Sequence, residues 1–356
     1  MQTDNGKFEL FTSVEELIHD TRIGRPHVVI LGAGASKAAF PDGDKNGKKP
    51  PLMCNFVETL GLNSDFERYR LQYKSDNFED IYSDLHEKSG YRELVELINR
   101  KVWNYFSNLE LPSYPTLYDH LVLSLREKDL IATFNWDPFL YYACWRNHKK
   151  VKLPHTAYLH GNVAVGYCLK DNTKGWIRSQ CSKCGEKFIP SRLLYPIKKD
   201  YSQEPFIKDE WETTKHALGS AYILTIFGYG APKSDVEAIK LMKSAWGDKY
   251  KRDIEQIEII DIKDERELRD TWRDFIHTHH YDITNDFYKS SIGLFPRRTC
   301  EAEWNYDMPE KEVFYPQNPI PKNLGFEELW EWYNPMIEAE NKKAQPFYCA
   351  SFKFNW

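Results

Sequence analysis

The hydrophobic pattern of the chain alternates between short β-branched runs and longer stretches of helical periodicity. The apolar runs lie at residues 27–31, 130–134, 156–159, 221–227 and 254–262. Apolar residues recur every three or four positions in residues 91–98 and 117–125, which is typical of amphipathic helices. Continuous apolar strands alternating with helices favour a parallel sheet covered on both faces, so the pattern predicts an α/β, doubly wound fold.

The first apolar run ends in a turn of small residues, Gly32-Ala33-Gly34-Ala35-Ser36. A strand that leads through such a turn into a helix lets a pyrophosphate approach the N–H groups at the helix N-terminus. Lys37 stands where the usual third glycine would be, and no acidic ribose ligand follows about 20 residues later. The turn alone leaves open a dinucleotide site and a tight connection without a ligand.

Polar or small residues also follow the later apolar runs. They are Thr133 near the end of the second run with Asn135 and Asp137 after it, His160-Gly161 after the third run, and Gly228-Tyr229-Gly230 after the fourth. The carboxyl ends of strands in a doubly wound sheet meet at one crevice. We therefore expect these residues to share a ligand-binding cleft.

The order of these motifs, GAG-x-S, T-x-N-x-D, H-G and a glycine turn, resembles the sirtuin family over roughly residues 26–265. The resemblance implies a Rossmann-like sheet with a helical insertion and a small zinc-ribbon-like insertion. Phe40-Pro41-Asp42 is not followed by the arginine of deacetylating sirtuins, and Trp136 and Pro138 also depart from their pattern. The chain is more similar to divergent bacterial sirtuin-like proteins that hydrolyse NAD in antiphage defence, and Asn77–Tyr82 fits their acidic helical stretch.

The resemblance also implies roles for the residues of the cleft. Asn135 would position water or a ribose hydroxyl, and His160 would be the base that takes its proton. Without the resemblance, a turn-capping amide and a satisfied buried histidine are the ordinary interpretations of the two. A carboxylate at a strand end is normally ionised, so Asp137 is expected to orient Asn135 or the nicotinamide amide rather than transfer a proton.

Cofactor-binding residues follow from the same resemblance, with NAD as substrate. Ser36 and the N–H groups of Gly34 and Ala35 would contact the phosphates. The other expected contacts are Gly32, Ala33 and Thr133, with Gly228 and Tyr229 at the adenosine half and Asp261 at a ribose hydroxyl.

The chain has seven cysteines, an odd number, which argues against a disulfide framework. Cys181-x-x-Cys184-Gly is the turn of a zinc knuckle, and Cys168 lies upstream of it. Sirtuins hold a four-cysteine zinc ribbon here, but a complete site would need His216 or Cys300 to fold back. Bound zinc and a degenerate, metal-free ribbon both remain open.

Charge and hydropathy exclude some function classes. The net charge is −5, from 48 basic and 53 acidic residues, and the basic residues are scattered, so direct nucleic-acid binding is disfavoured. No apolar run approaches the roughly 20 residues of a membrane span, and no signal-peptide core is evident at the start. We expect a cytoplasmic protein without a membrane partner.

The domain organisation follows from these segments. We expect an N-terminal capping helix in residues 1–25 and a catalytic domain in 26–270, with a helical insertion at 53–125 and the ribbon-like insertion at 162–216. Residues 271–356 form an aromatic-rich extension that either docks on its own core or makes a subunit interface. An NAD hydrolase needs an off state, so we expect a homo-oligomer or a separate partner; the resemblance suggests a translocase-type ATPase.

Three functions stay open at this stage. The first is an NAD hydrolase (NADase) that releases nicotinamide and ADP-ribose as a regulated antiphage effector. The others are a catalytically silent NAD or ADP-ribose sensor and an NAD-dependent protein deacylase.

Overall fold

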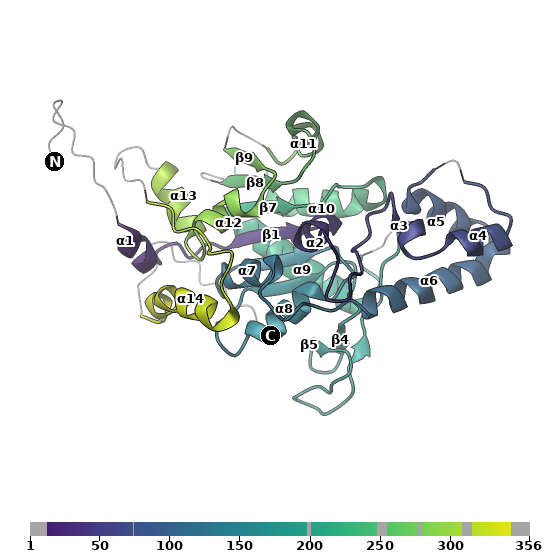
Figure 1. Cartoon of the computed structure of the whole chain (residues 1–356), viewed down its shortest axis with the longest axis horizontal. Helices are drawn as coiled ribbons and strands as arrows, with labels where there is room; N and C mark the ends of the chain where they lie inside the picture. Colours follow the sequence, from purple (N-terminus) through teal and green to yellow (C-terminus); the bar gives the residue numbers. More distant parts are fainter. Residues whose placement is uncertain are drawn as a thin grey trace.

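A computed structural model of the chain describes residues 13–73, 75–197, 201–247, 255–276, 280–307 and 315–342. The core is a six-stranded sheet in the order β3-β2-β1-β7-β8-β9, and every neighbouring pair is parallel (Figure 1). The strands are β1 (His27–Leu31), β2 (Leu130–Thr133), β3 (His155–Tyr158), β7 (Ile223–Phe227), β8 (Gln256–Ile260) and β9 (Tyr281–Thr284). The doubly wound α/β prediction is therefore confirmed.

The strand order places a topological switch between β1 and β7. The chain leaves β1 toward β2 on one side, and it returns after β3 to build β7, β8 and β9 on the other. Ligands of open α/β sheets bind where the order reverses, outside the carboxyl ends of the strands. The fold therefore directs attention to the loops after β1 and β7.

Helices cover both faces of the sheet, as right-handed crossovers require. Their bounds are α2 (Ala33–Ala39), α7 (Leu117–Leu123), α8 (Phe139–Asn147), α9 (Pro205–Ser220), α10 (Val236–Trp246) and α11 (Glu265–Thr271). Helix α9 packs along α10 and against β2 and β3, while α7 packs along α8. All residues of β1, β2, β7 and β8 are buried, which explains the apolar runs of β1, β2 and β7; β8 carries the buried polar residues Gln256 and Glu258 beside its isoleucines.

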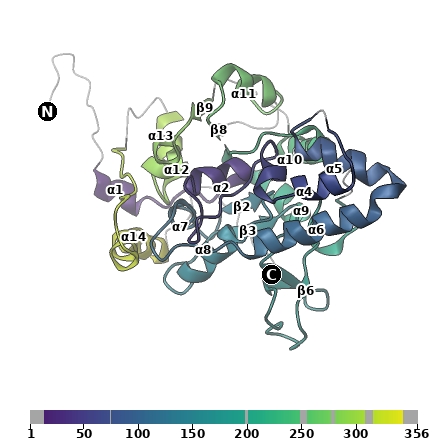
Figure 2. The same ribbon diagram turned by 45° about the vertical axis from the view of Figure 1, so that its right-hand side comes forward.

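A helical insertion between α2 and α7 projects from one end of the sheet (Figures 1 and 2). It contains α3 (Phe56–Thr59), α4 (Asn63–Arg68), α5 (Phe78–Glu87) and α6 (Arg92–Ser107). The Trp136 ring, which follows β2, meets Phe106 of α6 edge-on at 5.7 Å between ring centroids. The insertion thus packs directly on the loop that carries Asn135.

A second insertion is a small antiparallel sheet in the order β5-β4-β6. Its strands are β4 (Val165–Cys168), β5 (Thr173–Trp176) and β6 (Ile189–Pro190). It extends away from the main sheet at the bottom of Figure 1. The predicted ribbon-like insertion is therefore present.

The C-terminal elements pack back on the domain in the part of the chain that the structure describes. They are α12 (Ser291–Leu294), α13 (Thr299–Asp307) and α14 (Phe326–Asn341), and α14 lies beside α1 (Val14–His19). The Trp330 indole N–H donates to the Asn147 side chain at 2.8 Å, and the hydroxyls of Tyr333 and Ser124 are 2.7 Å apart. The contacts described for α14 are thus with its own core.

Two buried arginines tie these C-terminal elements together. Arg297 and Arg298 both pair with the Glu340 carboxylate, at 2.5 and 2.7 Å. Arg298 also donates to the carbonyl oxygens of Ile18 in α1 and Met336 in α14. Each buried charge is therefore paired and hydrogen-bonded.

No helix in the described ranges is long and apolar enough to cross a membrane.

Candidate active site at the sheet switch point

The glycine turn after β1 and the turn after β7 meet backbone to backbone. The Gly34 N–H donates to the Gly228 carbonyl oxygen at 2.9 Å. A Cβ on Gly34 would lie 2.7 Å from the Gly228 Cα, and Gly228 itself has a φ of 61°. Only glycines allow this approach, so the two turns form one wall at the switch point.

The backbone N–H groups of Gly34 and Ala35, which were expected to contact the phosphates, have hydrogen-bond partners within the chain. Gly34 donates to Gly228, and the Ala35 N–H donates to the Gly32 carbonyl oxygen at 3.0 Å. Ala33 opens α2, and its N–H belongs to the first turn of that helix. Phosphate binding by this turn therefore remains a prediction.

Asn135 lies at the centre of a buried hydrogen-bond network after β2. Its amide nitrogen donates to the Gly32 carbonyl oxygen at 2.9 Å and contacts the Ser36 hydroxyl at 3.0 Å. The Thr133 hydroxyl accepts the Asn135 backbone N–H at 3.0 Å. These hydrogen bonds hold the amide nitrogen toward the glycine turn. The amide oxygen is the acceptor of the group, so it is the atom that can accept a hydrogen bond from water or a ribose hydroxyl.

Asp137 belongs to the same network and is 4% exposed. Its carboxylate accepts the Ser36 hydroxyl proton at 2.6 Å, and the Ser36 oxygen lies 2.7 Å from the Tyr118 hydroxyl. Burial raises the pKa of Asp137 to about 6, although the Ser36 hydrogen bond opposes the rise. This differs from the ordinary strand-end carboxylate expected from the sequence, because the sequence does not show the depth of burial.

His160 follows β3 and is 5% exposed. Its Nε2 lies 3.0 Å from the Tyr201 hydroxyl and 3.7 Å from a carboxylate oxygen of Asp235. The other Asp235 oxygen accepts the Tyr229 hydroxyl proton at 2.8 Å. A carboxylate beside an imidazole favours its protonated form, so Asp235 can stabilise the cation formed when His160 accepts a proton.

Tyr229 lies between the glycine wall and the loop that carries His160. Its ring stacks on Phe134, with centroids 4.1 Å apart and planes 4° from parallel. Phe134 in turn meets the His160 ring edge-on at 4.7 Å. The side chain of Tyr229 thus lies beside His160, in addition to bordering the glycine wall.

Asn162 joins the loops that carry Asn135 and His160. Its amide nitrogen donates to the backbone oxygen of Asp137 at 2.6 Å and to that of Asn135 at 3.4 Å. Asn162, Asp235 and Tyr201 are site residues that the sequence motifs did not predict. Asn162 directly follows the H-G motif and Asp235 stands five residues after the Gly228-Tyr229-Gly230 turn, so both lie close to motifs of the sequence, whereas nothing in the sequence marks Tyr201.

Asp261 lies at the same edge of the sheet, directly after β8. Its N–H donates to the Thr284 carbonyl oxygen at 3.0 Å, and its side chain accepts the Lys263 N–H at 3.1 Å. The Gly228 N–H donates to the carbonyl oxygen of Ile260, the last residue of β8. Asp261 therefore follows the strand next to β7, one strand away from the glycine wall. Its ribose contact remains a prediction.

A cavity of about 750 Å³ lies behind the His160 loop. Its walls come from α5, α6 and residues 190–197, and include Tyr82, Trp103 and Tyr195. The Tyr195 ring is 5.2 Å from Trp136, and the Leu194 N–H donates to the His160 carbonyl oxygen at 3.0 Å. The cavity therefore shares a wall with the candidate catalytic loops.

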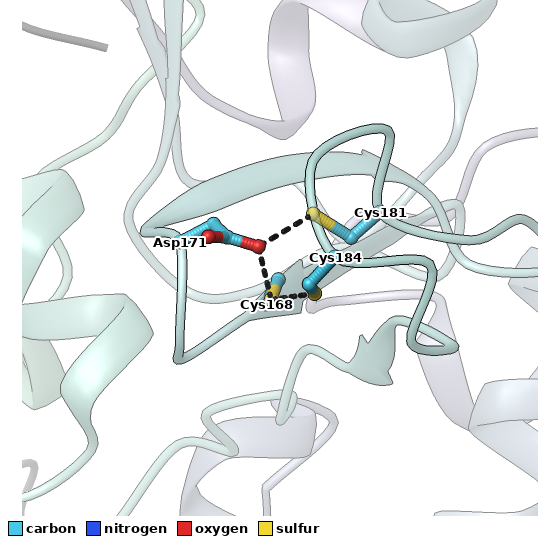
Figure 3. A group of neighbouring side chains, drawn as sticks. All are labelled: Cys168, Asp171, Cys181 and Cys184. Carbon is cyan, nitrogen blue, oxygen red and sulfur yellow. Dashed lines mark hydrogen bonds between the residues drawn. The ribbon is translucent and has the colours of Figure 1, made fainter.

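The ribbon insertion gathers four potential metal ligands (Figure 3). The ligand atoms of Cys168, Asp171, Cys181 and Cys184 all lie within 4.8 Å of one another. The sulfurs of Cys168 and Cys184 are 3.6 Å apart, and an Asp171 oxygen lies 3.2 Å from the Cys181 sulfur. Ligand atoms of a tetrahedral zinc site with bonds of about 2.3 Å lie roughly 3.8 Å apart, so three thiolates and a carboxylate fit zinc.

The fourth member of this group corrects an expectation from the sequence. From the sequence, a complete site would need His216 or Cys300, but the described group contains Asp171 instead. Cys300 is buried beside the Lys128 ammonium, 3.5 Å away, and His216 lies in α9. The hairpin between β4 and β5 returns Asp171 to the knuckle, which a search for further cysteines and histidines does not detect.

Comparisons with known proteins find similar solved structures only at low sequence identity. No family model and no curated protein matches the chain. A solved Sir2 enzyme is 14% identical, covers 82% of this chain and 96% of its own, and has a TM-score of 0.39. A Sir2 homologue in complex with NAD is 13% identical and covers 82% of this chain and 93% of its own, with a TM-score of 0.33. A mutant Sir2 homologue in complex with ADP-ribose is 13% identical and covers 93% and 98%, with a TM-score of 0.35.

Proposed function

We propose that the chain binds NAD at the switch point and hydrolyses its nicotinamide–ribose bond, giving nicotinamide and ADP-ribose. The observation that supports this most is the placement of Asn135 and His160 on adjacent loops beside the Gly34–Gly228 wall, with Asn162 bridging the loops. This is the crevice where doubly wound sheets bind nucleotides.

The chemistry of this bond matches the groups present. Nicotinamide leaves as a neutral molecule from a cationic ring, and the ribose passes through an oxocarbenium-like state, so no strong acid is needed. The reaction needs a group that positions water and a base of near-neutral pKa. The Asn135 amide oxygen would position the water, and His160 would accept its proton with Asp235 beside the imidazole.

The remaining polar residues would organise the site. Asp137 and Ser36 fix the Asn135 amide through the buried network. The Gly32 and Gly228 turns would line the dinucleotide, with Thr133 beneath Asn135 and Asp261 toward a ribose. Asp137 would act on Asn135 rather than on the substrate, because its carboxylate already bonds Ser36 and the Phe139 N–H.

Nicotinamide release from NAD by the purified chain tests this function. We expect wild type to release nicotinamide and ADP-ribose, and Asn135→Ala and His160→Ala each to lose on the order of 10² to 10⁴ in rate. Asn334→Ala and His216→Ala, which remove the same residue types from exposed helical positions, serve as matched controls. Unchanged turnover by the site variants would refute the assignment.

The same assay separates the other functions. A deacylase would release nicotinamide only with an acetylated peptide and would transfer the acetyl group. A silent sensor would bind NAD or ADP-ribose in calorimetry without turnover. Either result would replace the hydrolase proposal, while the switch-point cleft would remain the binding site.

We also propose that the ribbon insertion holds a structural zinc ion. Zinc bound by Cys168, Asp171, Cys181 and Cys184 would supply folding free energy to a ribbon that has only short strands. Elemental analysis of the purified protein tests occupancy, and a zinc-free, fully stable protein would contradict the site.

Control of the activity is the last element of this proposal. A free NAD hydrolase would drain its own cell, so we propose a regulated antiphage effector that acts as a homo-oligomer or with a partner such as a translocase-type ATPase. The burial of Asn135 and His160, 7% and 5% exposed, and the Phe134–Tyr229 stack support an off state that must open. Measuring the mass in solution together with NAD cleavage tests this regulation. A monomer that is fully active without an added partner would contradict the proposal.

A further inference from the structure

The cavity of about 750 Å³ behind the His160 loop has the size of a small-molecule site. Residues of α5 and α6 line it together with residues 190–195, 197 and 203–204. The lining includes none of the residues that the proposed NAD chemistry uses. The cavity is therefore a candidate site for a second ligand.

Two stacked tyrosines form an aromatic surface in this cavity. The rings of Tyr82 and Tyr195 are 5.1 Å apart between centroids, with planes 15° from parallel. The Tyr82 hydroxyl donates to the Asn99 side-chain oxygen at 2.8 Å, and the Tyr195 hydroxyl donates to the Asn99 backbone oxygen at 3.3 Å. Both rings are thus held in place by α6 before a ligand arrives. A fixed aromatic surface suits a flat ring, which packs on it face to face or edge-on.

The polar atoms of the lining that lack a partner are hydrogen-bond donors. The Asn99 amide oxygen is occupied by Tyr82, but within the described ranges no acceptor contacts the Asn99 amide nitrogen or the indole N–H of Trp103. The Ser191 hydroxyl, in contrast, accepts the Asn162 N–H at 3.0 Å and donates to the Asn162 carbonyl oxygen at 2.8 Å. The donors that remain favour a ligand that accepts hydrogen bonds.

The charge of the lining is positive. Arg100 and Arg192 both line the cavity, and neither guanidinium has an ion pair or a hydrogen bond in the part of the chain that the structure describes. Glu204 supplies the one carboxylate among the described lining residues. Its oxygens already accept the Tyr167 hydroxyl at 2.8 Å and the Ile207 N–H at 2.7 Å. Two unpaired guanidinium groups beside one occupied carboxylate favour an anion.

Arg192 brings this charge to the aromatic surface. Burial raises the pKa of Tyr82 to about 12, and the Asn99 hydrogen bond and the charge of Arg192 oppose the rise. The Arg192 guanidinium therefore lies near enough to Tyr82 to act on its hydroxyl electrostatically. The aromatic surface and the positive charge thus belong to one part of the cavity.

We propose that this cavity binds a small molecule in which a phosphate is attached to a planar aromatic ring. The ring would lie against Tyr82, Tyr195 and Trp103, and the phosphate would accept hydrogen bonds from Arg100 and Arg192. Guanidinium groups match phosphate oxygens in geometry and form stronger hydrogen bonds with them than neutral donors do. A neutral ring would leave both charges without a partner, and a free phosphate would leave the aromatic surface uncovered.

Calorimetric titration of the full chain with 1-naphthyl phosphate, at about 0.15 M ionic strength to screen surface charges, tests the proposal. We expect saturable binding, with 1-naphthol and inorganic phosphate each binding at least about 10-fold more weakly, because each lacks one of the two groups that the cavity contacts. Arg100→Gln and Arg192→Gln should each weaken binding of the ester on the order of 10-fold. Trp103→Leu should weaken binding of the ester but not of inorganic phosphate. Arg266→Gln, which removes an exposed arginine from α11, is the matched control and should bind as wild type.

Four results would overturn the site. They are the absence of heat at millimolar ester, equally tight binding of 1-naphthol or inorganic phosphate, an equal loss caused by Arg266→Gln, and wild-type binding by both variants of the lining arginines. The last result would place the ester elsewhere on the chain. Thermal unfolding of each variant checks that the fold is retained. Arg100 and Arg192 are exposed, so their variants keep the test decisive if Trp103→Leu does not fold.

Discussion

Replacing Asp137 by asparagine should remove a pH dependence of stability that the wild type carries. Burial raises the pKa of this carboxyl from 3.8 to about 6. The folded protein therefore holds the proton more tightly than the unfolded chain does. The stability contributed by this group is complete below pH 3.8 and is lost as the pH rises through about 6.

The size of the effect follows from the same two pKa values. The full difference corresponds to about 3 kcal/mol, at about 1.4 kcal/mol per pKa unit. Between pH 5 and pH 8, linkage gives a loss of about 1.4 kcal/mol from Asp137 alone. The asparagine of the variant cannot ionise, so the free energy of unfolding of Asp137→Asn should lack this component.

Urea unfolding of wild type and Asp137→Asn at pH 5 and pH 8 measures the difference. We expect the stability of the variant relative to wild type to increase by about 1.4 kcal/mol from pH 5 to pH 8. Glu265→Gln, at an exposed position on α11, reports the contribution of an ordinary surface carboxylate. A relative stability that is independent of pH, or that changes in the opposite direction, would refute the reasoning about the buried network.

Other perturbations test the remaining parts of the structure. Cys181→Ser should lower the unfolding temperature and zinc content before it affects NAD cleavage, because a structural ion contributes folding free energy; a stable, zinc-loaded variant that has lost only activity would contradict this. Asp235→Asn should slow NAD cleavage at least about 10-fold, since the cation formed when His160 accepts a proton loses the carboxylate 3.7 Å away; an unchanged rate would exclude this role of Asp235. Glu340→Gln should destabilise the fold by about 3–5 kcal/mol in urea unfolding, because it leaves the buried charges of Arg297 and Arg298 without a counter-ion; a loss below about 1 kcal/mol would show that the arginines find other partners.

The sequence predicted the parts of the fold that are buried on both sides. Strands β1, β2 and β7 form apolar runs because both of their faces are covered, and the isoleucines of β8 mark that strand although Gln256 and Glu258 alternate with them. The edge strand β9 was missed, since its residues are half-buried or exposed and carry no continuous apolar signal. Burial of an edge depends on neighbouring elements that a local pattern does not include.

In the candidate site, the residues at strand ends could be predicted from the sequence, and the residues brought in by loops could not. Asn135 and His160 stand at strand ends, so strand prediction alone brings them to one crevice. Asp171 and Asp235 reach their partners through loops whose paths are set by tertiary packing, and an acidic residue in a loop is ordinarily a solvated one. The raised pKa of Asp137 could not be foreseen for a related reason, because burial is a property of the assembled fold.

The pairing of Arg297 and Arg298 with Glu340 has a consequence for biosynthesis. Arg298 also bonds the Ile18 carbonyl oxygen, which lies 280 positions earlier in the sequence. The Arg297 and Arg298 contacts that join α1 to α14 therefore cannot form until α14 has emerged from the ribosome. Closing a loop of such length costs entropy, so the contact between α1 and the C-terminal elements is expected to form slowly. Pulse proteolysis of ribosome-stalled chains that end before and after α14 would show this late step directly.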